Sequence, residues 1–86
     1  MKHLATPRFW KLYGALDADI RDRADKAFAL LKENPSHPSL HFERKGAGWS
    51  ARVSAGYRAL AKKHGEDFLW VWIGTHDEYK RVIGSL

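Results

Sequence analysis

The spacing of apolar residues changes near Pro38, and this change constrains the possible folds more than any other feature of the sequence. Before Pro38, apolar side chains recur every three or four residues, which is the period of an amphipathic helix. After it, apolar and polar residues alternate, which is the period of a strand with one buried face. Helices followed by a run of strands are typical of an α+β domain and not of alternating βαβ units.

Two helices are predicted before Pro38. Thr6-Pro7 predicts a helix start, because the threonine hydroxyl can cap the first turn. Proline suits the first helical position, because the backbone N–H that it lacks would have no partner within the helix there. Asp17 is placed to begin a second helix, and Asn34-Pro35 ends it, because the residue before proline is pushed out of the α region. The apolar stripes of the two helices are Phe9, Trp10, Leu12, Tyr13 and Leu16, then Ile20, Ala24, Ala27, Phe28, Leu30 and Leu31.

Four strands and a last short helix are predicted after Pro38. Residues 40–44, 49–54 and 57–62 alternate between apolar and polar, with glycine-containing turns between them. Residues 68–73 are apolar on both faces, as in a central strand covered on both sides, so Trp70 and Trp72 are expected in the core. Thr75 or Asp77 is expected to cap the last helix, and His3–Ala5 are expected to form a short first strand.

These elements predict one α+β domain over residues 1–86. Its N-terminal helical hairpin packs on one side of an antiparallel β-sheet, and a short C-terminal helix follows. At 86 residues the chain has no room for a second core. It contains no cysteine, which excludes disulfides, thiolate zinc sites and a cysteine nucleophile. With no apolar stretch of 18 residues, the chain is expected to be cytoplasmic and to have no membrane partner.

The positive charge is concentrated in one segment. The formal net charge is +5, and residues 39–63 hold six basic residues against one acidic residue, so this segment carries the whole excess. Concentrated positive charge attracts polyanions and speeds their encounter with the protein. A basic surface that serves only solubility is the alternative interpretation.

Arg52 and Arg58 each occupy a position where an alternating strand places a polar side chain away from the helices. They flank the turn at residues 54–56, so antiparallel pairing is expected to bring them together on one face of the sheet. Two guanidinium groups on rigid strands suit bidentate recognition of phosphate. Most arginines on strands are simply solvated, and spacing alone leaves both interpretations open.

Five motifs in this order resemble the RelE/ParE superfamily of small bacterial type II toxins, over nearly the whole chain. They are residues 30–35 (LLKENP), 37–40 (HPSL), 49–53 (WSARV), 56–60 (GYRAL) and 72–79 (WIGTHDEY). The resemblance implies a RelE-like fold. In the RelE-like branch such proteins are ribosome-dependent mRNA endonucleases held inactive by an antitoxin, whereas the ParE-like branch poisons DNA gyrase.

The resemblance also implies catalytic residues. The basic strand residues of the family correspond to Arg52 and Arg58. Its C-terminal histidine and the aromatic residue that follows correspond to His76 and Tyr79, and its histidine before proline corresponds to His37. The position of one lysine in the RelE-type site is Ser50 here, so the chain is similar to the members that use histidine. Metal-free RNA cleavage needs a base, an acid and cations, and histidine, with an ordinary pKa of about 6.5, suits either proton-transfer role.

Other roles for the histidines stay open at this stage. His76 can instead cap the last helix, and His37 can be an ordinary loop residue. His3, His41 and His64 are expected at the surface, with His41 as a possible RNA contact. The sequence has no HxH pair and no cysteine, so neither a metal nor another cofactor is expected.

The expected partners are a cognate antitoxin protein, mRNA and the ribosome. The RNA contacts are expected from Arg44, Lys45, Lys62 and Lys63. Two alternative functions remain: a ParE-like toxin that inhibits gyrase without chemistry of its own, and a catalytically inactive relative that only binds an antitoxin. The pair of His76 and Tyr79 beside two strand arginines favours RNA cleavage, because a pure binding protein does not need it.

Overall fold

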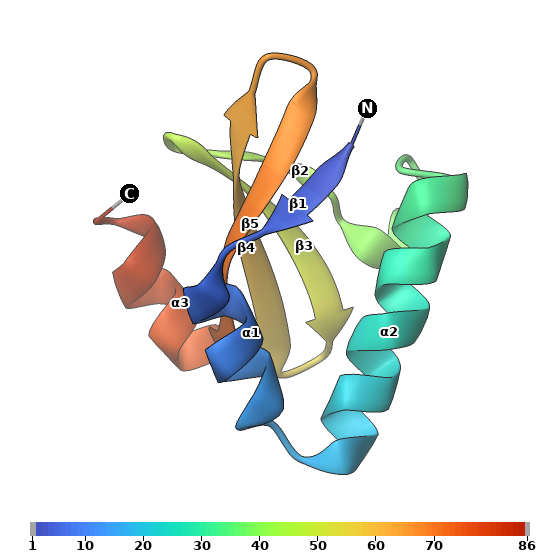
Figure 1. The fold of residues 1–86 in the computed structure, drawn as a ribbon, viewed down its shortest axis with the longest axis vertical. Coiled ribbons are helices and arrows are strands. Elements are labelled where there is room, and N and C mark those ends of the chain that lie inside the picture. The colour runs from blue at the N-terminus through green and yellow to red at the C-terminus, as the bar shows by residue number, and fades with distance from the viewer. Residues whose placement is uncertain (1, 86) are drawn as a thin grey trace.

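The computed structural model describes residues 2–85 and contains a five-stranded sheet with helices on both faces (Figure 1). The elements are β1 (His3–Ala5), α1 (Pro7–Gly14), α2 (Ala18–Glu33), a 3₁₀ turn (Pro38–Leu40), β2 (Glu43–Lys45), β3 (Gly48–Ser54), β4 (Tyr57–His64), β5 (Asp67–Thr75) and α3 (His76–Ile83). This order confirms the expected α+β class. No helix of residues 2–85 is long and apolar enough to cross a membrane.

The strands lie in the order β1-β5-β4-β3-β2. β2 to β5 pair antiparallel, as expected, but β1 pairs parallel to β5, with His3 opposite Phe68. The direction of β1 follows from its connection: the Thr6 N–H donates to the Trp70 carbonyl, and the chain then turns into α1. A three-residue strand carries no pattern that encodes this direction.

The helix boundaries follow the capping signals. The Thr6 hydroxyl accepts from the Phe9 N–H at 3.1 Å, and α2 ends at Glu33, before Asn34-Pro35. The cap of α3 is Thr75, whose hydroxyl accepts from the Glu78 N–H at 3.2 Å. The strand expected from residue 40 begins instead at Glu43, because Leu40 closes the 3₁₀ turn that Pro38 starts and His41 is left-handed, with φ of 45°.

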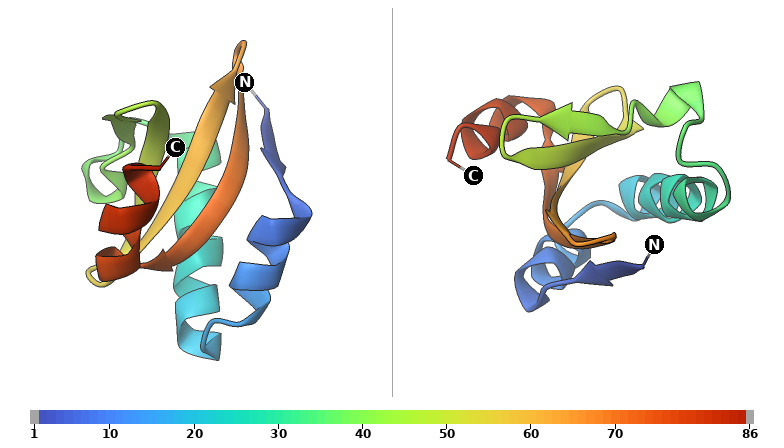
Figure 2. Two further views of the ribbon diagram at one scale, coloured as in Figure 1. Left: turned by 90° about the vertical axis from the view of Figure 1, so that its left-hand side faces the viewer. Right: turned by 90° about the horizontal axis from the view of Figure 1, so that it is seen from above.

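The helices cover the two faces of the sheet unequally (Figure 2). α1 packs on β5 and α2 packs on β3 on one face, whereas α3 packs against β4 and β5 on the other. The expectation that the N-terminal helical hairpin packs on one side of the sheet is therefore confirmed, and α3 lies on the other side. The core under α1 and α2 consists of Leu31, Leu40, Ala51, Ala59, Ala61, Phe68, Trp70 and Ile73.

A β-bulge in β5 distributes its two tryptophans between the faces. Leu60 pairs with Trp72 and Ala61 with Trp70, so Val71 has no partner residue in β4. Trp70 joins the core under α1 and α2, while Trp72 lies with Leu60 on the α3 side. Both indole rings belong to the interior, with 5% and 4% of each residue exposed, which confirms the expected core role.

Candidate functional site: a basic cleft beside the last helix

Arg52 and Arg58 are direct partners across the β3–β4 ladder, as the sequence predicted. They share the face of the sheet that is turned away from α1 and α2. Both line a cleft of about 540 Å³ at the edge of α3. The full lining is His41, Glu43, Lys45, Gly46, Ser50, Arg52, Arg58, His76, Tyr79, Ile83 and Gly84.

The guanidinium group of Arg58 is held by the hairpin turn that precedes it. Its Nη1 donates to the carbonyl oxygens of Ser54 at 2.7 Å and Tyr57 at 2.9 Å, with a longer contact of 3.4 Å to Ala55. All three bonds come from one nitrogen. Arg58 therefore stabilises the turn through Nη1 and is fixed in orientation for a ligand at its other nitrogens.

The lining of the cleft carries a net positive charge, with Lys45, Arg52 and Arg58 against Glu43. Burial lowers the pKa of Arg58, the neighbouring charge of Arg52 lowers it further, and Tyr79 acts in the opposite direction. Within residues 2–85 neither guanidinium forms an ion pair, and Glu43, the acidic residue in the lining, is paired with Lys45 at 3.2 Å. Two adjacent cations without a carboxylate partner favour binding of an anion such as phosphate.

The start of α3 brings His76 and Tyr79 to the same cleft. The His76 N–H donates to the Gly56 carbonyl at 2.8 Å, which ties the helix to the hairpin turn beside the arginines. The rings of His76 and Tyr79 stack, with centroids 5.8 Å apart and planes inclined by 23°. Because Thr75 caps the helix, the His76 imidazole is not used as the cap.

His37 is not among the residues that line the cleft. It begins the 3₁₀ turn, where its Nδ1 accepts from the Ser39 N–H at 3.2 Å and lies 2.8 Å from the Ser39 hydroxyl. This arrangement is that of a loop residue that stabilises its own turn. A catalytic role for His37 stays a prediction that the geometry of the cleft does not support.

The four predicted RNA contacts do not form one patch. Lys45 lines the cleft, whereas Arg44 pairs with Trp49, whose side chain lies on the α2 side. The Lys63 ammonium is 5.7 Å from the centroid of the Trp49 ring, so it also lies on that side. Lys62 follows Leu60 on the α3 side but is absent from the cleft lining.

Three features of the site and its surroundings were missed or misplaced at the sequence level. Ser50 lines the cleft and is 5% exposed. It lies two residues before Arg52, so the alternation of the strand places both side chains on one face, and this signal was sufficient to predict its position. Ile83 closes the cleft from the last turn of α3. His3 was expected at the surface but is half-buried, accepting from the Trp70 indole N–H at 3.0 Å, because three aromatic rings surround it.

Several solved structures of toxins and toxin–antitoxin complexes have the same fold. A YoeB/ParE toxin from Agrobacterium tumefaciens is 22% identical, with 88% of this chain and 99% of that chain covered and a TM-score of 0.65. The RelB–RelE antitoxin–toxin complex from Methanococcus jannaschii is 13% identical, with 92% and 96% covered and a TM-score of 0.70. YafQ from E. coli strain BL21(DE3) is 16% identical, with 90% and 94% covered and a TM-score of 0.65.

These similarities show that the chain has the fold of these toxins. The family model of the ParE-like toxin domain matches residues 18–81, and the chain belongs to that family. Comparison with curated protein sequences gives no match.

Proposed function

We propose that this protein is the toxin of a type II toxin–antitoxin system and acts in the cytoplasm as a metal-independent, ribosome-associated mRNA endonuclease. The observation that carries the proposal is the shared cleft of Arg52, Arg58, His76 and Tyr79. Translation is inhibited in this proposal because the message is cut while it is being read.

The proposed reaction transfers the phosphoryl group within the RNA. The 2′-oxygen forms a bond to phosphorus, the bond to the 5′-oxygen of the next nucleotide breaks, and the products are a 2′,3′-cyclic phosphate and a 5′-hydroxyl. A base accepts the proton of the 2′-hydroxyl and an acid supplies one to the leaving 5′-oxygen. Arg52 and Arg58 stabilise the charge that develops on the phosphoryl oxygens.

His76 is the proton-transfer group of this proposal, because an imidazole exchanges protons near neutral pH. Tyr79 stacks against it at the helix start, where its ring can also stack on an unpaired base. The Glu43–Lys45 pair lies at the opposite wall of the cleft, on β2.

Contacts to RNA outside the cleft come from Arg44, Lys62 and Lys63. Because these residues lie on different sides of the sheet edge, they suit a folded polyanion such as ribosomal RNA better than a single strand. Replacing Lys62 and Lys63 by glutamine is expected to weaken ribosome binding and reduce its salt dependence. An unchanged salt slope would remove these residues from the interface.

A cognate antitoxin is the second proposed partner. The solved structures with this fold include the RelB–RelE and RelBE complexes of a toxin with its antitoxin, and the DinJ–YafQ complex. An acidic antitoxin segment complements the unpaired charges of Arg52 and Arg58 and covers the cleft by helix docking or strand addition. A co-purified antitoxin that leaves these residues exposed contradicts this part of the proposal.

Gyrase inhibition is the second candidate function, because the matching family model is that of the ParE-like toxin domain. In that case the cleft is a binding surface, and no chemistry takes place in it. An inactive relative that only binds antitoxin is the remaining alternative.

Induced expression followed by primer extension on cellular mRNA separates the three functions. Cleavage within translated messages, lost in the Arg52→Ala variant, is the expected result. Intact mRNA with defective DNA supercoiling supports gyrase inhibition instead. Normal growth with intact mRNA and normal supercoiling supports an inactive relative.

A further inference from the structure

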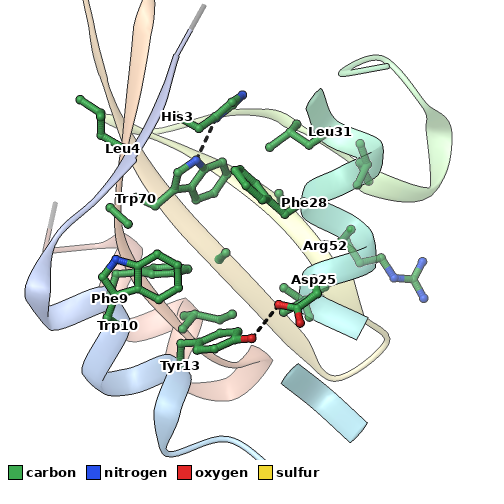
Figure 3. Close-up of a pocket in the computed structure, with 18 residues that line it drawn as sticks. His3, Leu4, Phe9, Trp10, Tyr13, Asp25, Phe28, Leu31, Arg52 and Trp70 are labelled. Atoms are coloured by element: carbon green, nitrogen blue, oxygen red, sulfur yellow. Dashed lines mark hydrogen bonds between the residues drawn. The ribbon is translucent and has the colours of Figure 1, made fainter. Parts of the chain in front are cut away.

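A second cavity lies between α1 and α2, on the face of the sheet opposite the basic cleft (Figure 3). Its volume is about 240 Å³ and its lining is almost entirely apolar. Small side chains make room for it: Ala24 and Ala27 on α2 face Ala51 and Ala59 on the sheet. The two helices pack on different strands, so the cavity stays open between them.

The rim of this cavity exposes large apolar residues. Trp10 is 57% exposed, Leu4 55% and Phe28 40%. The sequence placed Trp10 and Phe28 in the apolar stripes of two helices packed together, and the structure shows that α1 and α2 leave them uncovered. Clustered apolar residues around a concave surface are typical of ligand sites.

One buried polar atom at the upper end of the cavity lacks a hydrogen-bond partner. His3 lines the cavity, and its Nδ1 accepts from the Trp70 Nε1–H at 3.0 Å. In the neutral ring the proton is therefore on Nε2. Within residues 2–85 that Nε2 is buried without an acceptor, a situation that costs free energy unless a ligand supplies one.

A cation lies near the same end. The Lys32 ammonium is 4.7 Å from the centroid of the Phe28 ring, and that ring meets His3 edge-on with centroids 5.6 Å apart. A hydrogen-bond donor and an ammonium group at one end of an apolar cavity are complementary to an anionic acceptor on an apolar body.

We propose that the cavity between α1 and α2 binds a small amphipathic carboxylate, whose flat hydrocarbon body lies between the helices and whose carboxylate lies between His3 and Lys32. A dry cavity of about 150 Å³ accommodates benzene, so a cavity of 240 Å³ has room for a body of about two fused rings. The acceptor oxygen satisfies the His3 Nε2–H.

The cavity and the basic cleft use the same strands and share one lining residue, Arg52. On β3 and β4 the residues alternate: Ala51 and Ala59 line the cavity, whereas Ser50 and Arg58 line the cleft. The His3 end of the cavity, where the carboxylate is proposed to lie, is not part of the cleft. The inference therefore does not depend on the proposed endonuclease activity.

The test titrates 2-naphthoate into the purified protein by calorimetry, with 2-naphthylmethanol as a neutral probe of nearly the same shape. Inorganic phosphate is present in excess, so that binding of the carboxylate to Arg52 and Arg58 is suppressed. We expect saturable binding of one 2-naphthoate, about tenfold tighter than the alcohol, which corresponds to about 1.4 kcal/mol. Equal affinity of the two probes overturns the role of the carboxylate, and absence of binding overturns the site.

Matched variants locate the bound probe. Ala27→Leu fills the cavity and is expected to lower the affinity for 2-naphthoate by at least about tenfold, since the space it needs is lost. Ala29→Leu makes the same change at an exposed position of α2 outside the cavity lining and is expected to bind normally. Lys32→Gln is expected to weaken only the carboxylate, whereas Lys26→Gln on the outer face of the helix does not.

A measurement on the unaltered protein removes any dependence on variant folding. In NMR spectra 2-naphthoate is expected to shift the methyl signals of Ala24, Ala27 and Ala51. Shifts confined to His76 and Tyr79 place the probe in the basic cleft and overturn the proposal. Undiminished binding to a folded Ala27→Leu variant overturns it as well.

Discussion

Arg52 on β3 and Arg58 on β4 stand directly opposite each other, on the same face of the sheet. Like charges in this position repel and destabilise a strand pair. Burial lowers the pKa of Arg58, and the charge of Arg52 lowers it further; only this second contribution reflects the repulsion. The fold thus holds two cations together at a cost in stability, and an anion bound between them offsets the cost.

The cost predicts that Arg52→Ala stabilises the folded protein while it abolishes growth inhibition. Removing one of two opposed charges is expected to raise the free energy of unfolding by about 0.2–1 kcal/mol at low salt. Urea denaturation measures the change, and high salt should shrink it because screening weakens the repulsion. Arg44→Ala, at an exposed position of β2, is the control. A clear loss of stability in Arg52→Ala contradicts this interpretation.

Arg58→Ala is expected to behave differently, because its Nη1 bonds hold the turn carbonyls of Ser54 and Tyr57. Loss of these charged hydrogen bonds is expected to cost about 1–3 kcal/mol of stability. Arg58→Lys keeps the charge but has a single nitrogen where arginine has three, so it should recover part of the RNA affinity without the stability. Denaturation and binding measured on both variants check the prediction. Full stability of Arg58→Ala contradicts the role in the turn.

Packing requires a glycine at position 74, and its replacement is predicted to disturb the cleft by displacing α3. Gly74 lies opposite Arg58, and a Cβ there would be 2.6 Å from Cζ2 of Trp72. Gly74→Ala is expected to cost about 1–3 kcal/mol and to displace α3. Gly14→Ala is the matched control: a Cβ meets nothing within 4 Å, so the change should be neutral or stabilise α1 by up to about 1 kcal/mol. Equal effects of the two substitutions on the melting temperature contradict the packing argument.

Features set by local sequence were predictable. The caps Thr6 and Thr75 satisfy N–H groups within three residues of themselves, so their residue types are sufficient signals. The pairing of Arg52 with Arg58 follows from a short turn, because a hairpin of that length leaves little choice of register.

Features that depend on distant contacts were not predictable. The bulge at Val71 separates the faces of Trp70 and Trp72, and the apolar run that contains them looks the same with or without it. The burial of His3 depends on Trp70, 67 residues away, and on the Phe28 ring of α2. The membership of Lys45 in the cleft depends on the register of β2, which the alternation of its neighbours does not fix.

His3 is predicted to make stability depend on pH. Its pKa is lowered chiefly by burial, and then by positive charge including Lys32, while Asp67 acts in the opposite direction. A lowered pKa in the folded state means that the unfolded state binds the proton more tightly, so the stability contribution is present above pH 6.5 and is lost as the pH falls through the folded-state value. The unfolding free energy of the wild type should therefore fall relative to that of His3→Phe from pH 7 to pH 5. A difference independent of pH contradicts the prediction.

His76 carries the sharpest prediction of the mechanism. If it transfers a proton, His76→Gln should bind RNA normally but cleave it about 10²–10⁴-fold more slowly, the usual contribution of such a group. The variant leaves the Thr75 cap in place, so α3 should keep its stability, and thermal denaturation checks this. A substrate with a 5′-thio leaving group needs little protonation, so it should restore the rate of the variant if His76 is the acid. Normal binding without that rescue assigns His76 as the base, and full activity of the variant on ordinary RNA removes it from the mechanism.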